Sequence, residues 1–252
     1  MPLRPNSAVG ADWLPYGEPC DDAATRLFCL PHAGGSAWTF HRWRFGLLPE
    51  WIDVQPVQLP GRAGRSGEPL ATRMDTLLPG LTEGLLPFLD RPFAIFGHSM
   101  GALLAYELAH RLQQRMAMPA HLIVAGHSAP HLPQPELAVH HLPDAELLDV
   151  LRGYHGTPPE FFANPALVAA LLPVIRADFS VNDTYVYRHR AALRCPITVL
   201  AGLDDVTTPL GALPEWARHT RAECEVHVLP GGHFFTNTAV GEIAQIIARK
   251  LQ

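Results

Sequence analysis

The sequence predicts an α/β fold in which a mostly parallel central sheet is flanked by helices. Short apolar segments that end in turn residues alternate along the chain with longer segments of helical periodicity. With 48% hydrophobic residues, the 252-residue chain can bury a full core, and its length suits a single domain over residues 1–252. Residues 1 to about 24, which are rich in Pro, Gly and charge, are expected to form a loosely attached lead-in.

The regular elements follow one another in the order expected for such a sheet. Strands are predicted where apolar runs lie between turn signals, at 26–30, 53–59, 93–96, 121–126, 196–201 and 223–229. Helices are predicted from apolar periodicity, or from good helix formers without Gly or Pro, at 38–48, 74–89, 102–112 and in the C-terminal segment up to Leu251.

Residues from about 131 to 187 interrupt this alternation. They carry no strand signal, and helices are expected at 144–151, 165–180 and 184–191. An all-helical insertion between two strands would cover the carboxyl ends of the sheet, where ligands bind in parallel α/β folds. We therefore predict that this insertion is a lid.

Composition argues against several classes of protein. A net charge of −5 and scattered Lys and Arg argue against nucleic-acid binding, and the lack of an 18-residue apolar run argues against a membrane span. No apolar leader precedes the first strand, so the cytoplasm is the expected location. The four cysteines lie far apart and the 14 histidines lack metal-ligand spacing, so neither a disulfide framework nor a metal site is expected.

The pentapeptide Gly97–Gly101 lies between a predicted strand and a predicted helix. A serine on such a tight turn takes a strained conformation that exposes its hydroxyl, and flanking glycines let strand and helix pass closely. Ser99 is therefore the predicted nucleophile. The helix start behind it supplies unpaired N–H groups for a developing oxyanion, Met100 N–H among them. His98 is interpreted as a packing residue, because its side chain should point away from Ser99.

Two later loops supply partners for this serine. An acid is expected after the strand at 196–201, where Asp204 and Asp205 compete, and Gly202 with Pro209 favours Asp205. His233 follows the last strand in a Gly-rich loop and suits the catalytic base. The chain order Ser99, Asp205, His233 is that of α/β-hydrolases. Since the nucleophile is a serine, the dehalogenase and epoxide hydrolase branches, which carry an aspartate there, are excluded.

Other segments are expected to shape the site. The loop Pro31–Ala37 follows the first strand, and Ala33 N–H is the candidate second oxyanion donor. Apolar residues of the insertion, Phe179 among them, either line an acyl pocket or pack only on each other and the sheet; Phe234 is a further candidate for substrate binding. The loop 60–69 carries Arg62, Arg65 and Glu68, and is either a solvated turn or a structural clamp at the rim of the site.

Five motifs together resemble those of the type II thioesterases, stand-alone α/β-hydrolases associated with polyketide synthases and non-ribosomal peptide synthetases. These motifs are Leu30-Pro31-His32-Ala33-Gly34-Gly35, Leu59-Pro60-Gly61-Arg62 with Arg65 and Glu68, Gly97-His98-Ser99-Met100-Gly101, Arg176-Ala177-Asp178-Phe179, and Gly231-Gly232-His233-Phe234-Phe235. The chain departs from this family where its acid is doubled and followed by Val206 instead of the more usual proline.

The resemblance implies hydrolysis of acyl or aminoacyl groups from the phosphopantetheine of acyl or peptidyl carrier domains, which clears stalled or mis-primed carriers. It implies no cofactor, since the substrate carries the phosphopantetheine. Arg62, Arg65, Arg188 and Arg190 are candidate contacts for an acidic carrier, and a monomer suffices. A similar vertebrate enzyme releases medium-chain fatty acids from fatty acid synthase. A small-molecule esterase or lipase and a non-enzymatic binding module on the same fold are the alternatives.

Overall fold

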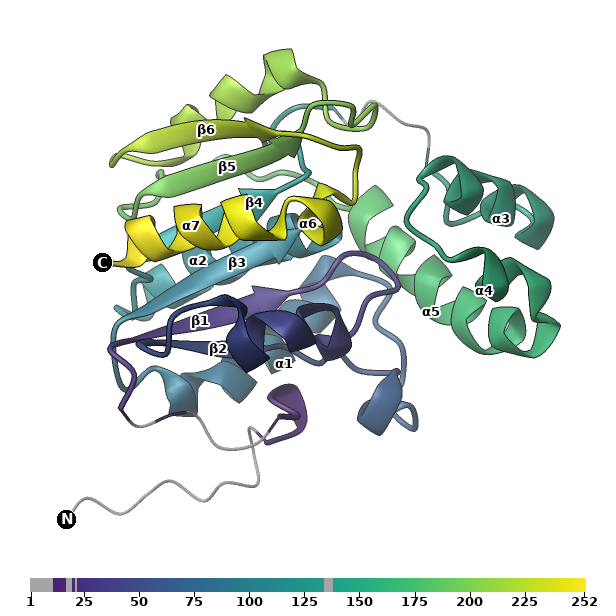
Figure 1. Cartoon of the computed structure of the whole chain (residues 1–252), viewed down its shortest axis with the longest axis horizontal. Coiled ribbons are helices and arrows are strands. Elements are labelled where there is room, and N and C mark those ends of the chain that lie inside the picture. Colours follow the sequence, from purple (N-terminus) through teal and green to yellow (C-terminus); the bar gives the residue numbers. More distant parts are fainter. Residues whose placement is uncertain (1–10, 17–19, 21, 134–137) are drawn as a thin grey trace.

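The computed structural model describes residues 11–16, 20, 22–133 and 138–252. Within these residues, six parallel strands form one sheet in the order β2-β1-β3-β4-β5-β6 (Figure 1). The strands are β1 (Thr25–Leu30), β2 (Ile52–Pro56), β3 (Phe93–His98), β4 (His121–Ala125), β5 (Ile197–Gly202) and β6 (Cys224–Leu229). The predicted α/β-hydrolase class, with a parallel sheet between helices, is confirmed.

The central strands β1, β3, β4 and β5 are buried along their whole length because both faces of the sheet are covered. In β1, Leu27 and Cys29 point into one core, whereas Phe28 and Leu30 point into the other. Successive side chains of a strand alternate between faces, so a strand between two helical layers becomes a continuous apolar run. This is the pattern that identified the strands in the sequence.

Helices cover the two faces of the sheet. Helices α1 (Met74–Leu85) and α2 (Met100–Gln114) share one core with Phe28, and α7 (Val240–Leu251), which follows the short α6 (Phe235–Thr238), packs on the opposite face (Figure 1). Shorter helical segments are η1 (Ala11–Trp13), η2 (Ala37–Phe40), η3 (Trp43–Leu47), η4 (Ala63–Arg65), η5 (Leu86–Phe88) and η6 (Leu210–His219). The helix predicted at 38–48 is thus broken, since Gly46 has a φ of +121°.

The insertion between β4 and β5 contains α3 (Asp144–Gly153), α4 (Pro159–Ala163) and α5 (Pro165–Asp183), which project beyond one end of the sheet (Figure 1). These helices have a small core of their own, formed by Val139, Leu147, Leu151, Phe161, Leu172 and Ile175. The helix predicted at 184–191 is wrong. The backbone there is irregular, and Tyr185 and Arg190 donate hydrogen bonds to Glu107 of α2. This tertiary contact replaces the local preference for helix.

The lead-in is attached more firmly than the sequence suggested. Trp13 is 7% exposed and Leu14 4% exposed in the core beneath α1. A Cβ on Gly84 would lie 2.2 Å from the Trp13 ring, so α1 leaves room for this indole. The expectation of a loosely attached segment is wrong for these residues, and residues 1–10 lie outside the described ranges.

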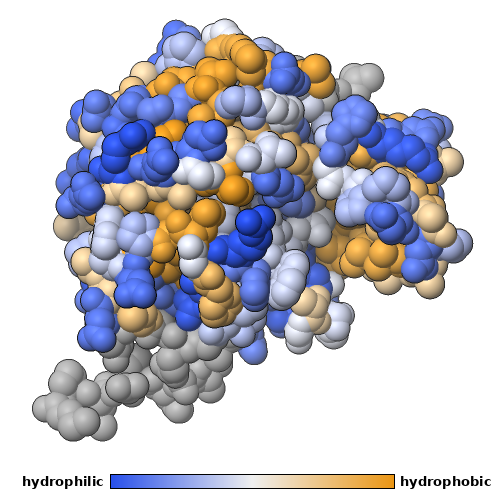
Figure 2. Space-filling view, in the orientation of Figure 1, coloured by the Kyte–Doolittle hydropathy of each residue, from blue (hydrophilic) through white to orange (hydrophobic). Residues whose placement is uncertain are grey.

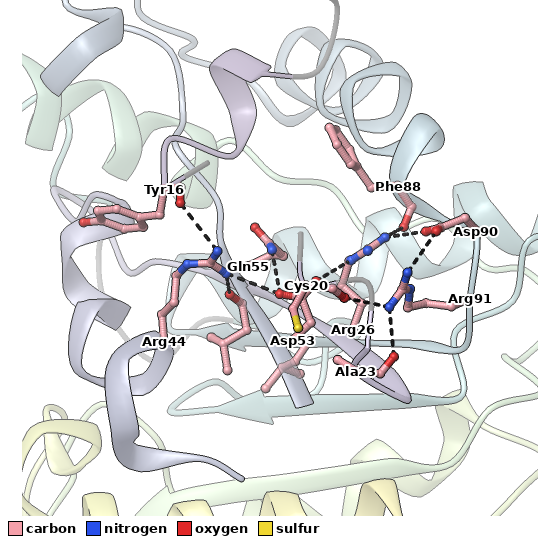
Figure 3. Close-up of polar contacts among 12 residues, drawn as sticks. Tyr16, Cys20, Ala23, Arg26, Arg44, Asp53, Gln55, Phe88, Asp90 and Arg91 are labelled. Atoms are coloured by element: carbon pink, nitrogen blue, oxygen red, sulfur yellow. Dashed lines mark hydrogen bonds and ion pairs between the residues drawn. The ribbon is translucent and has the colours of Figure 1, made fainter. Parts of the chain in front are cut away.

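A buried polar network joins the strands at the end of the sheet where β1 and β2 begin (Figure 3). The Arg26 guanidinium, on a residue only 1% exposed, donates to Asp53 Oδ2 at 2.8 Å and to Asp90 Oδ1 at 2.5 Å. Arg44 donates to Asp53 Oδ1 at 3.3 Å. Because a buried charge is costly unless it is paired, these contacts fix the edge strand β2 against β1.

Candidate active site

The turn from β3 into α2 holds Ser99 in a conformation that few residues adopt, with φ 56° and ψ −123°. The glycines around it are sterically required. A Cβ on Gly97 would lie 2.0 Å from the carbonyl oxygen of Gly101, and a Cβ on Gly101 would lie 2.3 Å from that of Leu30. Strand and helix can therefore cross closely only with glycine at both positions, and the serine side chain lies at the carboxyl end of the sheet.

The structure brings Ser99, His233 and Asp205 into one hydrogen-bonded chain. His233 Nε2 lies 2.9 Å from Ser99 Oγ, and His233 Nδ1 lies 3.0 Å from Asp205 Oδ2. Since a carboxylate can only accept, Nδ1 carries the proton, and the Nε2 lone pair is free to accept from the serine hydroxyl. The three side chains follow β3, β5 and β6, which all end at the same edge of the sheet.

Of the two neighbouring acids, Asp205 is the one that contacts the histidine. Its side chain is fully buried, whereas Asp204 is exposed. The Thr207 hydroxyl and N–H donate to Asp205 Oδ1 at 2.7 and 2.9 Å. Burial favours the neutral acid, but the hydrogen bond and charge of His233 and the two Thr207 bonds outweigh it and hold the pKa of Asp205 below its ordinary value.

Two supporting residues were missed as functional in the sequence. Thr207 Oγ1 also lies 2.9 Å from His233 Nδ1, so this hydroxyl links acid and base. The buried His98 donates from Nε2 to the His233 carbonyl oxygen at 2.9 Å, so the residue before the nucleophile fixes the loop that carries His233. Burial and the charges of His233 and His32 lower the pKa of His98, which therefore stays neutral. Its packing role was expected, but its partner lies 135 residues away.

Both candidate oxyanion donors line the same cavity as the serine. Met100 is the first residue of α2, so its N–H has no partner within the helix, and Ala33 lines the same cavity as Ser99. The loop of Ala33 is held by Asp178 of α5, whose carboxylate accepts the Gly34 N–H at 2.7 Å and pairs with Arg62. For Arg62, the contact with Asp178 therefore supports the structural clamp over the solvated turn.

A cavity of about 490 Å³ extends from Ser99 and His233 under the helical insertion. Its apolar wall comes mainly from the insertion: Val139, Leu151, Tyr154, Phe161, Leu167, Leu171, Ile175 and Phe179. Phe234 also lines it, with its ring centre 5.3 Å from that of His233. The core of the insertion and the cavity wall overlap, because Val139, Leu151, Phe161 and Ile175 belong to both. Figure 2 shows hydrophobic surface over this part of the molecule, where Leu167 and Leu171 are partly exposed.

Helix α5 is apolar because it lines this cavity and also packs into the hydrophobic cores of the insertion and of the sheet. By length and composition alone it could cross a membrane, which for one helix is weak evidence. In the structure Ile175 and Phe179 line the cavity, and Asp178, 1% exposed, forms a buried ion pair. Among the described residues, no group of three or more His, Cys, Asp or Glu is placed to hold a metal ion.

Three of the four arginines considered as carrier contacts are engaged inside the molecule. Arg62 pairs with Asp178, Arg65 with Glu68, and Arg190 with Glu107. Arg65 also stacks on Trp13, with its guanidinium carbon 4.1 Å from the ring centre. Their positive charge is therefore neutralised by internal partners, and only Arg188 keeps an exposed side chain.

The family model of the thioesterase domain matches residues 25–251. The chain belongs to the thioesterase family. This thioesterase is 41% identical over 244 residues to linear gramicidin dehydrogenase LgrE of Brevibacillus parabrevis, with 95% of this chain and 92% of LgrE covered. It is 37% identical over 253 residues to thioesterase PikA5 of Streptomyces venezuelae, with 100% and 89% covered.

A comparison with solved structures points to the same family. The type II thioesterase BorB from the borrelidin biosynthetic cluster superposes on this thioesterase with a TM-score of 0.86 at 38% identity, covering 93% of this chain and 96% of BorB. The predicted resemblance to type II thioesterases is therefore confirmed, and so is the expectation that the protein is a hydrolase.

Proposed function

We propose that this thioesterase hydrolyses acyl or aminoacyl groups from the phosphopantetheine thiol of carrier domains in polyketide or non-ribosomal peptide synthesis. One observation carries the proposal. The hydrogen-bonded chain of Ser99, His233 and Asp205 opens into an apolar cavity large enough for an acyl group. The relatives supply the setting, since BorB comes from a biosynthetic cluster and PikA5 is named a thioesterase.

The geometry supports an acyl-enzyme mechanism. His233 Nε2 takes the proton of Ser99 while Oγ attacks the thioester carbonyl, and Asp205 stabilises the imidazolium that forms. The carbonyl oxygen becomes an oxyanion on the N–H groups of Met100 and Ala33. Collapse breaks the C–S bond, and His233 returns the proton to the departing pantetheine thiolate.

A water molecule then completes the cycle. His233 takes one proton from it while the hydroxide attacks the acyl-serine, and on collapse His233 returns that proton to Ser99 Oγ, which releases the acid and restores the serine hydroxyl. Every step uses side chains and backbone of this chain, so the scheme needs no cofactor beyond the pantetheine of the substrate. The scheme transfers an acyl group to water. It contains no redox step and so differs from the dehydrogenase activity in the name of LgrE.

The decisive experiment compares two substrates with one acyl group. Hydrolysis of a hexanoyl-phosphopantetheinyl carrier protein is measured beside that of ethyl hexanoate, with Ser99→Ala as the control. We expect faster clearance of the carrier thioester and a fall in kcat of about 10³–10⁶-fold in the variant, with its melting temperature retained. Preference for the free ester would point instead to a small-molecule esterase, and retained activity in Ser99→Ala would remove the serine from the mechanism.

A further inference from the structure

The loop that carries the second oxyanion donor has almost no side chains with which to hold itself. Its sequence is Ala33-Gly34-Gly35, and Gly34 has a φ of +77°, which favours glycine. A Cβ on Gly34 would lie 2.7 Å from Cγ1 of Ile175, so the loop packs directly on helix α5. Glycine gives the loop this close approach, but it also leaves the backbone free to rotate unless neighbouring groups fix it.

Three side chains provide that restraint, two of them from distant parts of the chain. Asp178 Oδ2 accepts the Gly34 N–H at 2.7 Å, and His32 Nδ1 donates to the Ala33 carbonyl oxygen at 3.0 Å. These bonds hold the N–H and C=O ends of one peptide group, the one that directly follows the Ala33 N–H. Arg62 Nη1 donates to the Gly35 carbonyl oxygen at 3.0 Å and fixes the next part of the loop.

The charge of Asp178 is neutralised where it would otherwise oppose the reaction. An unpaired carboxylate beside the oxyanion loop would raise the energy of a negatively charged intermediate. Arg62 forms two bonds to it, Nη1 to Oδ2 at 2.5 Å and Nη2 to Oδ1 at 2.6 Å, with both side chains almost fully buried. The paired guanidinium thus leaves Asp178 to act as a hydrogen-bond acceptor with little net field.

We propose that Asp178, clamped by Arg62, is a positioning residue that aims the Ala33 N–H at the oxyanion. This inference rests on the proposed function, in which Ala33 is an oxyanion donor. Asp178 does not touch the reacting atoms and acts through the peptide group of Ala33 and Gly34. Because it lies on α5 between Ile175 and Phe179, which line the cavity, the acyl-pocket wall and the oxyanion loop are held as one unit.

The test measures Asp178→Ala and Asp178→Asn with p-nitrophenyl hexanoate, a substrate that needs no carrier. Loss of a complete oxyanion donor costs about 10²–10³ in kcat. A donor that is present but misaimed should cost less, so we expect a fall in kcat of about 10–100-fold for Ala, with KM within about threefold. Asn keeps an oxygen for the Gly34 N–H and should recover part of the loss.

A transition-state analogue separates positioning from stability. Hexaneboronic acid forms a tetrahedral adduct with the serine that places an oxygen in the oxyanion site, so its inhibition constant should rise by about the same factor as kcat/KM falls. Asp53→Ala is the matched control, because it breaks a buried arginine–aspartate pair at the other end of the sheet. It should lower the melting temperature and leave kcat and boronate inhibition unchanged.

A second variant guards against loss of folding. Arg62→Met/Asp178→Leu replaces the ion pair by apolar side chains of similar size, an exchange that buried pairs often tolerate. It lacks the acceptor and should show the same loss of kcat while remaining folded. Wild-type kcat in this variant, or boronate inhibition unchanged in Asp178→Ala, would overturn the inference and leave the proposed function standing. If the wild type cleaves the p-nitrophenyl ester and ignores carrier thioesters, the proposed function fails and Asp178 is still tested.

Discussion

Replacing Asp205 with asparagine keeps the shape of the side chain and reverses its hydrogen bonding to His233. Thr207 donates twice to Oδ1, so the amide oxygen of the variant should take that position and turn its NH₂ group towards His233. Nδ1 must then accept, which places the ring proton on Nε2. In that tautomer Nε2 already carries a proton. It can no longer accept the proton of Ser99, whose Oγ lies 2.9 Å away in the wild type.

The size of the effect follows from the contact that is lost. In the transition state His233 becomes an imidazolium whose Nδ1 lies 3.0 Å from Asp205 Oδ2. At an effective dielectric constant of about 20, opposite charges at that distance attract by about 5.5 kcal/mol. Since about 1.36 kcal/mol changes a rate tenfold, we expect kcat of Asp205→Asn to fall roughly 10⁴-fold.

The assay is kcat for p-nitrophenyl hexanoate, with Asp204→Asn as the matched control. Asp204 is exposed, and its backbone N–H, bonded to the Gly231 carbonyl oxygen, is unaffected by the change. Its variant should therefore stay within about twofold of wild type. A loss below tenfold in Asp205→Asn, or an equal loss in both variants, would refute this account of the acid.

Three further predictions concern the pocket and the stability of the fold. Phe179→Ala should enlarge the cavity wall and raise kcat/KM for decanoyl over hexanoyl thioesters severalfold; an unchanged ratio would mean that Phe179 does not shape the acyl pocket. Asp53→Ala should lower the free energy of unfolding by about 3 kcal/mol, measured in urea, because Arg26 keeps only part of its pairing; a loss below about 1 kcal/mol would contradict that role. Acid should destabilise the protein, because burial lowers the pKa of four histidines to about 3 or 4, while the unfolded chain binds protons below pH ~6.5. Stability is then full above pH ~6.5 and falls as the pH drops towards 4, by up to about 5 kcal/mol per pH unit in urea titrations, whereas a flat profile would refute the assignment. These histidines are His32, His110, His121 and His219.

The parts of the structure that the sequence indicated are those that local chemistry determines. The strands could be located because burial on both faces of the sheet demands mostly apolar residues. The turn at Ser99 could be located because Gly97 and Gly101 are sterically required around it. Asp205 and His233 could be proposed because each follows a strand, and parallel strands bring their carboxyl ends to one edge.

The parts that failed or were missed depend on partners distant in the sequence. Residues 184–191 are predicted to be helical, yet Tyr185 and Arg190 bind Glu107 and the backbone is irregular. The Arg62 loop allowed two interpretations because its partner, Asp178, lies 116 residues away on a helix whose packing no local pattern specifies. Thr207 carries no motif that distinguishes it from any threonine in a turn.

The two buried arginine–aspartate pairs, at opposite ends of the sheet, differ in what they hold. Arg26 and Asp53 join β1 to β2, which the strand ladder and the packing of the core already hold in register. Arg62 and Asp178 hold a loop of small residues that has few other restraints on its peptide planes. Loss of the first pair should therefore appear mainly in the free energy of unfolding. Loss of the second should appear mainly in kcat, because a rotation of one peptide group misaims an oxyanion donor while costing the fold little.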